Sequence, residues 1–568
     1  MASFTQFIRD GHYITNELFQ KASQIQASKR NNTFYAALKE LRCFEDGQLV
    51  KLACDFFGYH LVNNAFEVKV DFEKTEKIYG DIFAAIDRKS CVITHNDKEY
   101  VIIYDPEDES TKNTCTIALG SDPKFAICTD ADFSIINQYQ LQPRAVWSRA
   151  QSVKYAADAK PITGSLMRGF TRNADMTTSA VDSLLTMLMD AALNRRASDL
   201  HIQQLSDEDA QVLFRIDGKI YHYTNIDADT LPNLRTKLKT MCDIGGTDQT
   251  MPVEGQIKHV HNDVNIDVRV NVITTTKNRY DFTLRFISSD IRELDDLGLN
   301  PDVLTKYRNL LHMTKGLVII CGPTGCGKTS LLYAGFKELL RQEHQPIICS
   351  VEDPVEIVLP GVTQVDVKKE KKMTYAKVFP SFLRHDPDVI TIGEVRTLEV
   401  AEQAIQSSNT GHLTFTTLHT NDALSAITRL TNLGLDPYVV GDVLAAIVAQ
   451  RLIRRVCPHC AEEYQLPIDH EWRKRYNLGN EPLVLKKGKG CSHCAGTGYL
   501  GRMAVNEIVV SSPILRDAIQ KNQTRTEIER VLESTPEGHK TYIEDAVEKA
   551  LAGKTTFEEV DALYKDVL

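Results

Sequence analysis

The sequence predicts an α/β protein whose main domain is a parallel β-sheet covered by helices. From about residue 300, short and mostly apolar segments alternate with helical ones, as in repeated βαβ units. The predicted strands are LVIIC (317–321), PIICSVE (346–352), DVITIGEV (388–395) and LTFTTLH (413–419). The first strand runs into CGPTGCGKTS (321–330), in which residues 322–329 match G-x-x-x-x-G-K-[ST], the motif of a phosphate-binding loop. We expect this loop at the carboxyl edge of the sheet.

A smaller α+β domain is predicted to precede the main one. SAVDSLLTMLMDAAL (179–193) has apolar residues at helical spacing, whereas AQVLFRIDGKIYHY (210–223), IKHVHNDVNIDVRVNVI (257–273) and YDFTLRFIS (280–288) alternate with the period of strands. We place this domain at residues 178–292 and the main domain at residues 293–568.

The amino-terminal part is less regular. We expect a separate α/β domain at residues 1–150, with a strand in EYVIIYDPED (99–108) and the start of a helix in DFSIINQY (132–139). Residues 151–177 lack clear periodicity and are predicted to be a linker.

The net charge and the hydropathy of the chain argue against some classes of function. The formal net charge is −10, which argues against direct nucleic-acid binding because phosphate contacts need a basic surface. The first residues contain no basic segment followed by an apolar one, and no apolar run reaches the ~20 residues that span a bilayer. We therefore expect a cytoplasmic protein that reaches the membrane through partners.

The phosphate-binding loop supplies the first candidate site. Its glycines let backbone N–H groups converge on the phosphates of a nucleoside triphosphate. Lys328 is expected to reach the β and γ phosphate oxygens, and the Thr329 hydroxyl to ligate magnesium. The expected cofactor-binding residues are Gly322, Pro323, Thr324, Gly325, Cys326, Gly327, Lys328, Thr329 and Ser330.

Three later stretches place polar side chains next to predicted strands. SVEDPVEI (350–357) contains Glu352, RHDPDVITIGEVR (384–396) contains Glu394, and NTGHLTFTTLHTNDA (409–423) carries His412 and His419 on either side of its strand. Strand ends at one sheet edge are where an enzyme with a phosphate-binding loop keeps its magnesium, its water and the groups that sense the γ-phosphate. We expect these residues to take part in that chemistry.

In this order, the stretches resemble the secretion ATPases of type II secretion systems and type IV pili. The resemblance covers about residues 180–568. It also includes ASDLHI (197–202), RIDGKI (215–220), AQRLIRRVC (449–457) and LAGKTTFEEV (551–560). It implies a RecA-type ATPase core with a preceding PAS-like domain, a ring-shaped homohexamer, and ATP with Mg²⁺ as the bound nucleotide.

The resemblance also implies roles for the residues near the strands. Glu394 would support the magnesium shell or its water, and Glu352 would orient or deprotonate the attacking water, although the two glutamates could exchange roles. His412 and His419 would link the γ-phosphate to the rest of the subunit.

Two arginines of the preceding domain match residues that the family contributes to the nucleotide. These are Arg269 and Arg285, where a guanidinium group would stabilise transition-state charge. Pairing of Arg285 within its own domain remains an alternative. The chain has KNRYDFTLR (277–285) where the family usually has Gly-Glu-Arg, so a role for Arg279 is doubtful.

Four of the thirteen cysteines form two pairs, CPHC (457–460) and CSHC (491–494). Two such knuckles complete a tetrahedral site, so Cys457, Cys460, Cys491 and Cys494 are predicted to bind structural Zn²⁺. Metal binding is favoured over disulfides in a cytoplasmic chain. His459 and His493 are not expected to be ligands, and the other nine cysteines are expected to be mostly small buried hydrophobes.

The function expected from the resemblance is a cytoplasmic hexameric ATPase that powers assembly of a type IV pilus or a type II secretion pseudopilus. It would act through an inner-membrane platform protein, and the tetracysteine insertion is typical of motors that extend a pilus. A retraction or DNA-uptake motor of the same family is the nearest alternative. A nucleic-acid translocase and a zinc-bearing scaffold that binds ATP without hydrolysing it are more distant ones.

Overall fold

The computed structural model describes residues 3–28, 33–146, 172–244, 251–287, 291–367, 373–491, 493–535 and 539–565. The chain divides into two compact units, Met1–Phe286 and Ile287–Leu568. The predicted linker at 151–177 lies outside the described residues as far as residue 171, and residues 172–177 begin a long helix.

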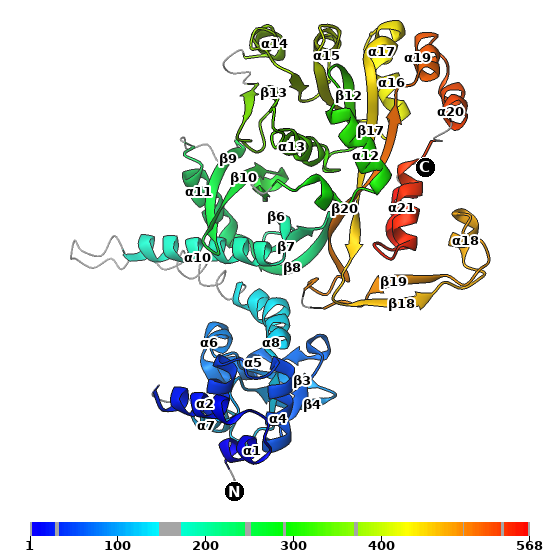
Figure 1. Cartoon of the computed structure of the whole chain (residues 1–568). Coiled ribbons are helices and arrows are strands. Elements are labelled where there is room, and N and C mark those ends of the chain that lie inside the picture. The colour runs from blue at the N-terminus through cyan, green and yellow to red at the C-terminus, as the bar shows by residue number, and fades with distance from the viewer. Residues whose placement is uncertain are drawn as a thin grey trace, which may run out of the picture. The chain divides into compact units, whose positions relative to one another are not determined.

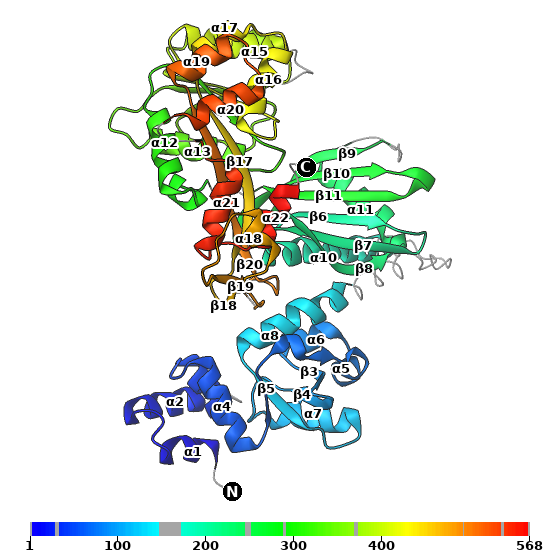
Figure 2. The ribbon, with the colours of Figure 1, turned by 90° about the vertical axis from the view of Figure 1, so that its right-hand side faces the viewer.

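The first 146 residues combine a helical cluster with a five-stranded sheet in the order β1-β5-β4-β3-β2. Helices α1 to α4 enclose an aromatic core around Phe4, Phe34 and Tyr35, to which Ile127 of β5 also contributes. This core was not predicted from the sequence. Figure 2 shows these helices in blue beside the strands. The elements are α1 (Phe4–Asp10), α2 (Asn16–Ser28), α3 (Phe34–Glu40), α4 (Asp46–Phe57), β1 (His60–Val62), η1 (Ala65–Glu67), β2 (Lys69–Val70), α5 (Phe72–Tyr79), α6 (Ile82–Asp87), β3 (Cys91–His95), β4 (Lys98–Ile102), α7 (Glu109–Leu119), β5 (Phe125–Cys128), α8 (Asp130–Ile136) and η2 (Asn137–Leu141).

The second part of this unit is an α+β domain, as the alternating segments predict. Its six strands are in the order β8-β7-β6-β11-β10-β9, and α10 and α11 pack on the apolar face. The strands lie side by side in Figure 2. The elements are α10 (Arg172–Asn194), β6 (Ala197–Gln204), β7 (Asp209–Ile216), β8 (Lys219–Asp227), η3 (Ala228–Thr230), α11 (Leu231–Met241), β9 (Val253–His261), β10 (Val264–Thr274), η4 (Thr276–Asn278) and β11 (Tyr280–Ile287).

The second unit contains the predicted parallel sheet, with seven strands in the order β14-β13-β15-β16-β12-β17-β20. All neighbouring pairs are parallel except β17 with β20. The elements up to β17 are η5 (Leu294–Leu297), α12 (Pro301–Leu311), β12 (Gly316–Cys321), α13 (Lys328–Leu339), β13 (Ile348–Glu352), β14 (Val362–Asp366), α14 (Tyr375–Phe382), β15 (Val389–Ile392), α15 (Leu398–Asn409), β16 (Leu413–Leu418), α16 (Ala423–Asn432), α17 (Pro437–Val443) and β17 (Leu444–Val456).

Both faces of this sheet are buried. Along β12, Leu317 and Ile319 enter one core with α14 to α17, whereas Val318 and Ile320 enter another with α12 and α13. This alternation explains why the strands are almost continuously apolar in sequence. It also means that polar groups collect where the strands end.

The antiparallel pair of β17 and β20 extends beyond the sheet to a small ribbon of β18 and β19, as Figure 1 shows. The apolar segment at residues 438–449, which the sequence marked only as too short to span a membrane, forms α17 and the first half of β17. The remaining elements are β18 (Ala461–Gln465), α18 (Glu471–Arg475), β19 (Val484–Gly488), β20 (Tyr499–Val510), α19 (Pro513–Gln520), α20 (Arg525–Glu533), α21 (Tyr542–Leu551) and α22 (Phe557–Lys565).

Candidate functional site

The phosphate-binding loop lies between β12 and the N-terminus of α13, at the carboxyl edge of the sheet. Gly322 and Gly327 have positive φ angles of 149° and 88°. A Cβ atom at Gly322 would lie 2.5 Å from the Gln450 carbonyl oxygen, and one at Gly327 would lie 2.8 Å from the Gln450 side chain. Only glycine therefore fits where the loop passes β17. The N-terminus of α13 follows the loop directly. Its unpaired backbone N–H groups and its helix dipole favour the binding of an anion there.

Lys328 begins α13 and is buried, although it is a cation. Its Nζ atom donates hydrogen bonds to the carbonyl oxygens of Gly322, at 2.7 Å, and Pro323, at 3.2 Å. Burial lowers the pKa of Lys328. A negatively charged phosphate at this point would oppose that shift and stabilise the ammonium form.

A buried chain of amides supports the loop from the neighbouring strands. Gln450 on β17 donates from Nε2 to the Cys326 carbonyl oxygen at 2.9 Å, and Asn506 on β20 donates from Nδ2 to Gln450 Oε1 at 3.0 Å. The Asn506 backbone N–H donates to Asp545 on α21, which also accepts a hydrogen bond from Lys549. Neither Gln450 nor Asn506 was predicted from the sequence to support the loop. In the sequence, these two residues stand out only as polar residues within two otherwise mostly apolar segments.

Glu394 follows β15, two strands away from β12. Its carboxylate lies 3.1 Å from His419 Nε2 and 2.7 Å from Arg396 Nη2. Thr416 and Thr417 of β16 donate hydrogen bonds to the carbonyl oxygens of Ile392 and Gly393. These threonines hold the end of β15 against β16, so that Glu394 and His419 face each other.

The electrostatics of this pair favour a charged carboxylate and a neutral imidazole. Burial alone would raise the pKa of Glu394, but the hydrogen bond from Arg396 and the positive charges of Arg396 and Lys328 oppose it, and the pKa is lowered. Burial, together with the positive charge of Lys328, lowers the pKa of His419. An ionised Glu394 beside an uncharged His419 suits coordination of a hard cation through oxygen.

Glu352 ends β13, the next strand outward, and is only 7% exposed. Its Oε1 atom accepts hydrogen bonds from Ser350, at 2.7 Å, and Gln364, at 3.2 Å, while Oε2 accepts one from Tyr333, at 2.5 Å. Tyr333 lies on α13, so Glu352 is tied directly to the helix that follows the phosphate-binding loop. A carboxylate has about four acceptor positions, and these three donors leave one of them free on Oε2.

His412 does not join the other residues. It precedes β16, whereas His419 follows it, and the Gly316 backbone N–H at the start of β12 donates to the His412 carbonyl oxygen. Seven residues of extended chain place it about 23 Å from His419, at the amino edge of the sheet. There its Nδ1 atom lies 3.1 Å from the Ser407 carbonyl oxygen and 3.0 Å from the Thr410 hydroxyl.

The predicted arginines lie in the other unit. Arg269 is half-buried on β10. Arg285 on β11 donates from Nε to the buried Asp199 at 2.7 Å, which is the pairing within its own domain that the sequence left open. Arg279 pairs with Asp207 at 3.0 Å.

The tetracysteine cluster is formed by chain segments next to β17, β18, β19 and β20. Cys457, Cys460, Cys491 and Cys494 place their Sγ atoms within 4.8 Å of one another, and three of the pairs are 3.7, 3.7 and 3.8 Å apart. Four sulfurs bound tetrahedrally to zinc at ~2.3 Å are separated by about 3.8 Å. The cluster therefore has the dimensions of a closed Zn²⁺ site.

The surroundings of one thiol in the cluster favour its ionised form. The Cys494 sulfur accepts hydrogen bonds from the backbone N–H groups of Cys491 and Gly498, at 3.1 and 3.3 Å. Burial opposes ionisation, but these donors outweigh it and lower the pKa of Cys494. His459 and His493 stack on each other with ring centroids 3.8 Å apart and are not among the four converging ligands.

The scattered cysteines largely follow the expectation. Cys54, Cys91, Cys115, Cys128, Cys321, Cys326 and Cys349 are buried, whereas Cys43 and Cys242 are half-buried.

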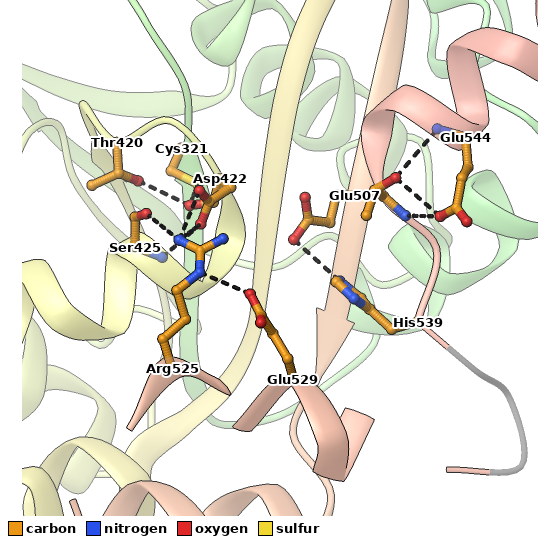
Figure 3. A network of polar contacts seen from close by, with 10 residues as sticks. Cys321, Thr420, Asp422, Ser425, Glu507, Arg525, Glu529, His539 and Glu544 are labelled. Atoms are coloured by element: carbon orange, nitrogen blue, oxygen red, sulfur yellow. Dashed lines mark hydrogen bonds and ion pairs between the residues drawn. The ribbon is translucent and has the colours of Figure 1, made fainter. Parts of the chain in front are cut away.

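Figure 3 shows a polar network that joins the C-terminal helices to the loop after β16. Arg525 on α20 lies 3.1 Å from the carboxylate of Asp422, which caps α16 through the Ser425 backbone N–H. The Cys321 thiol, immediately before the phosphate-binding loop, donates to the Asp422 carbonyl oxygen at 3.5 Å. In the same view, His539 lies 3.2 Å from Glu507 of β20. Among the described residues, no helix is both long and apolar enough to cross a membrane.

Known proteins are similar to this chain in sequence. The family described as "Type II/IV secretion system protein" matches residues 174–562. A type IV pilus assembly ATPase, PilB, of Thermus thermophilus is 35% identical over 67% of this chain, and the match spans 43% of that relative's length. The type II secretion system ATPase E of Vibrio cholerae is 32% identical over 71% of this chain and 80% of its own length.

A solved structure agrees at the level of the fold. The Legionella pneumophila ATPase DotB is 18% identical and superposes with a TM-score of 0.51 over 68% of this chain and 96% of its own. The phosphate-binding loop, the parallel sheet and the family match agree with one another. The chain therefore belongs to the type II/IV secretion system protein family and is an ATPase of that family.

Proposed function

We propose that this chain is the motor that hydrolyses Mg-ATP to assemble a type IV pilus or a type II secretion pseudopilus, acting as a homohexamer on an inner-membrane platform protein. The observation that carries the proposal is the carboxyl edge of the seven-stranded sheet. There, the phosphate-binding loop, the Glu394–His419 pair and the buried Glu352 follow neighbouring strands of one subunit.

The nucleotide would be held by residues 322–330. Lys328 would leave the carbonyl oxygens that it now contacts and bind the β and γ phosphates. Thr329, which is half-buried in the first turn of α13, and Glu394 would hold Mg²⁺ or its water ligands. His419 would report the state of the γ-phosphate through its contact with Glu394.

Glu352 would orient or deprotonate the attacking water through the free acceptor position of its Oε2 atom. Tyr333 couples this carboxylate to the helix that binds the phosphates, so it would hold the base in position relative to the reacting group. Ser350 and Gln364 fix the other oxygen.

Arg269 and Arg285 would stabilise transition-state charge from the preceding domain. For Arg285 this requires that the Asp199 pair open or be shared with phosphate. Because His412 lies at the amino edge, we propose that it orders the turn before β16 and does not touch nucleotide.

The direction of the motor is inferred from two features. The relatives described above include a pilus assembly ATPase, and the chain has a cysteine cluster of zinc dimensions, which the family resemblance associates with extension. A cytoplasmic location beside the inner membrane follows from the proposed platform partner.

The test is steady-state ATP hydrolysis by the purified chain, alone, with single-stranded DNA, and with the cytoplasmic part of a candidate platform protein. We expect stimulation by the platform fragment and none by DNA. Stimulation by DNA alone would contradict the proposal and favour a translocase. Native mass measurement of the same sample should give six copies in the presence of ATP.

A further inference from the structure

A second cluster of metal-ligating side chains lies in the α+β domain. His259 and His261 are two residues apart on β9, so both side chains point to the same face of the sheet as Val253 and Ile257. That face is covered by α10, which carries Asp190. The ligand atoms of these three residues lie within 4.8 Å of one another.

The two imidazoles converge on a single oxygen atom. Asp190 Oδ1 lies 2.8 Å from His259 Nε2 and 2.9 Å from His261 Nδ1. Within the described residues, Asp190 forms its ion pairs with these two histidines and with no lysine or arginine. A cation placed between the three atoms would take the place of the two hydrogen bonds that now meet at this oxygen.

The dimensions suit a first-row divalent ion. Nitrogen and oxygen ligands at ~2.0–2.1 Å around a tetrahedral ion are about 3.3 Å apart, so an outward shift of a few tenths of an ångström would open the site. His259 is 7% exposed, whereas the Asp190 side chain is 38% exposed and leaves a path for an ion. Three protein ligands would leave one position for water or another ligand.

Asn262 contacts one of the two histidines from the side away from Asp190. Its amide nitrogen lies 3.1 Å from Nε2 of His261, the ring nitrogen that faces away from Asp190. When Nδ1 binds a metal, Nε2 carries the proton, and a flipped Asn262 amide can accept it through its oxygen. The same residue can therefore support either tautomer of His261.

We propose that Asp190, His259 and His261 form a binding site for a divalent transition-metal ion, such as Zn²⁺, separate from the tetracysteine site. The bound ion would cross-link α10 to the β9–β10 hairpin. Two imidazoles and a carboxylate favour zinc and its neighbours over Mg²⁺ or Ca²⁺, which prefer oxygen ligands alone.

The experiment counts zinc on the full chain, stripped of metal and titrated with Zn²⁺ against a chromophoric chelator. We expect two tight sites per chain, of which a thiol-blocking reagent releases only one. His261→Asn and Asp190→Asn should each reduce the count from two to one, and the remaining ion should be the one that the thiol reagent releases. The matched control His222→Asn, an exposed histidine of the same sheet, should retain both.

A second measurement does not depend on the count. Zinc added to chain that already holds one ion should raise the unfolding temperature of the wild type and of H222N, but not of H261N or D190N. A wild-type chain with one zinc, all of it released by the thiol reagent, would overturn the proposal. Two sites that persist unchanged in H261N and D190N would equally overturn it.

Discussion

Strands β17 and β20 connect two regions that are built in different ways. Near its middle, β17 supports the phosphate-binding loop through Gln450, and at its end it enters the tetracysteine cluster through Cys457. The nucleotide side draws on the ends of β12, β13, β15 and β16, whose residues are far apart in sequence. The cysteine side draws on two four-residue knuckles whose ligands are set by local spacing.

The difference shows what each kind of site depends on. The cysteine cluster needs only two correct turns and one metal ion, because bond formation to the ion supplies most of its stability. The nucleotide side depends on threonines, amides and a tyrosine that hold each charged group in position. Damage to the first region should therefore remain local, whereas damage to the second should reduce catalysis.

The largest effect is expected from the two glutamates. Glu352→Gln should reduce ATP turnover by about 10²–10⁴-fold, as for loss of a general base, while Mg-ATP binding is retained. Glu394→Gln should instead raise the Mg²⁺ concentration needed for half-maximal activity. Turnover measured against Mg²⁺ at saturating ATP, with nucleotide binding measured separately, distinguishes the two.

Glu356→Gln is the matched control, since Glu356 is exposed in the loop that follows β13. If E352Q shifts the Mg²⁺ requirement and E394Q does not, the two roles are exchanged. Equal effects in E356Q would mean that the loop charge matters rather than the buried carboxylate.

The cysteine region provides the second prediction. Replacing Cys457 and Cys460 by serine should abolish zinc binding at this cluster and make residues 457–498 sensitive to protease. ATP turnover should fall by less than the ~10²-fold lower bound expected for loss of the base, because β18 and β19 lie outside the seven-stranded sheet. Zinc content, limited proteolysis and turnover are measured together, with Cys43→Ser as the control.

A loss of turnover as large as that of E352Q would refute the separation of the two regions. It would mean that β17 transmits the state of the cluster to Gln450.

The sequence was sufficient where a motif is local. The phosphate-binding loop, the four cysteines and the strands β12, β13, β15 and β16 could all be predicted, because each is encoded by adjacent residues or by a clear period. β17 could not, since an apolar segment that begins as a helix and continues as a strand has no single period. The partners of Glu352 could not be predicted either, because Tyr333, Ser350 and Gln364 meet only after the sheet has formed.

His412 shows that a sequence motif can also suggest a shared role for residues that the fold keeps apart. Its motif contains two histidines, and the sequence suggests a shared role. A six-residue strand separates them, and parallel strands have two distinct edges. The structure thus places one histidine beside Glu394 and the other beside the Ser407 carbonyl oxygen.

Replacement of Gln450 tests the support of the phosphate-binding loop and should have a smaller effect on activity. Gln450→Leu should leave the Cys326 carbonyl oxygen and the Asn506 amide without partners, at a cost of about 1–3 kcal/mol. We expect this to appear mainly as a roughly tenfold rise in the KM for ATP, since each 1.4 kcal/mol is a factor of ten. Gln465→Leu, at an exposed position, should change neither KM nor stability.

A double variant tests whether the amides act as a unit. If Gln450→Leu and Asn506→Leu together cost about as much as either alone, the chain from Cys326 to Asp545 is one network. Simple additivity would show that β20 does not support the loop.

The smallest effect is expected from Arg525, at the opposite end of the C-terminal helices from the cysteine cluster. Its side chain is 51% exposed and that of Asp422 is 19% exposed, so solvent screens the pair and its contribution is about 0.2–1 kcal/mol. Arg525→Ala should therefore lower the unfolding midpoint slightly, and the difference from wild type should shrink as salt is added. The control Arg530→Ala, at an exposed arginine of the same helix that interacts with Glu527 through charge alone, should have a smaller salt-dependent effect. Because Asp422 also caps α16 just beyond His419, a change in turnover larger than the change in stability would indicate that α20 positions the loop after β16, and would extend the catalytic region into the C-terminal helices.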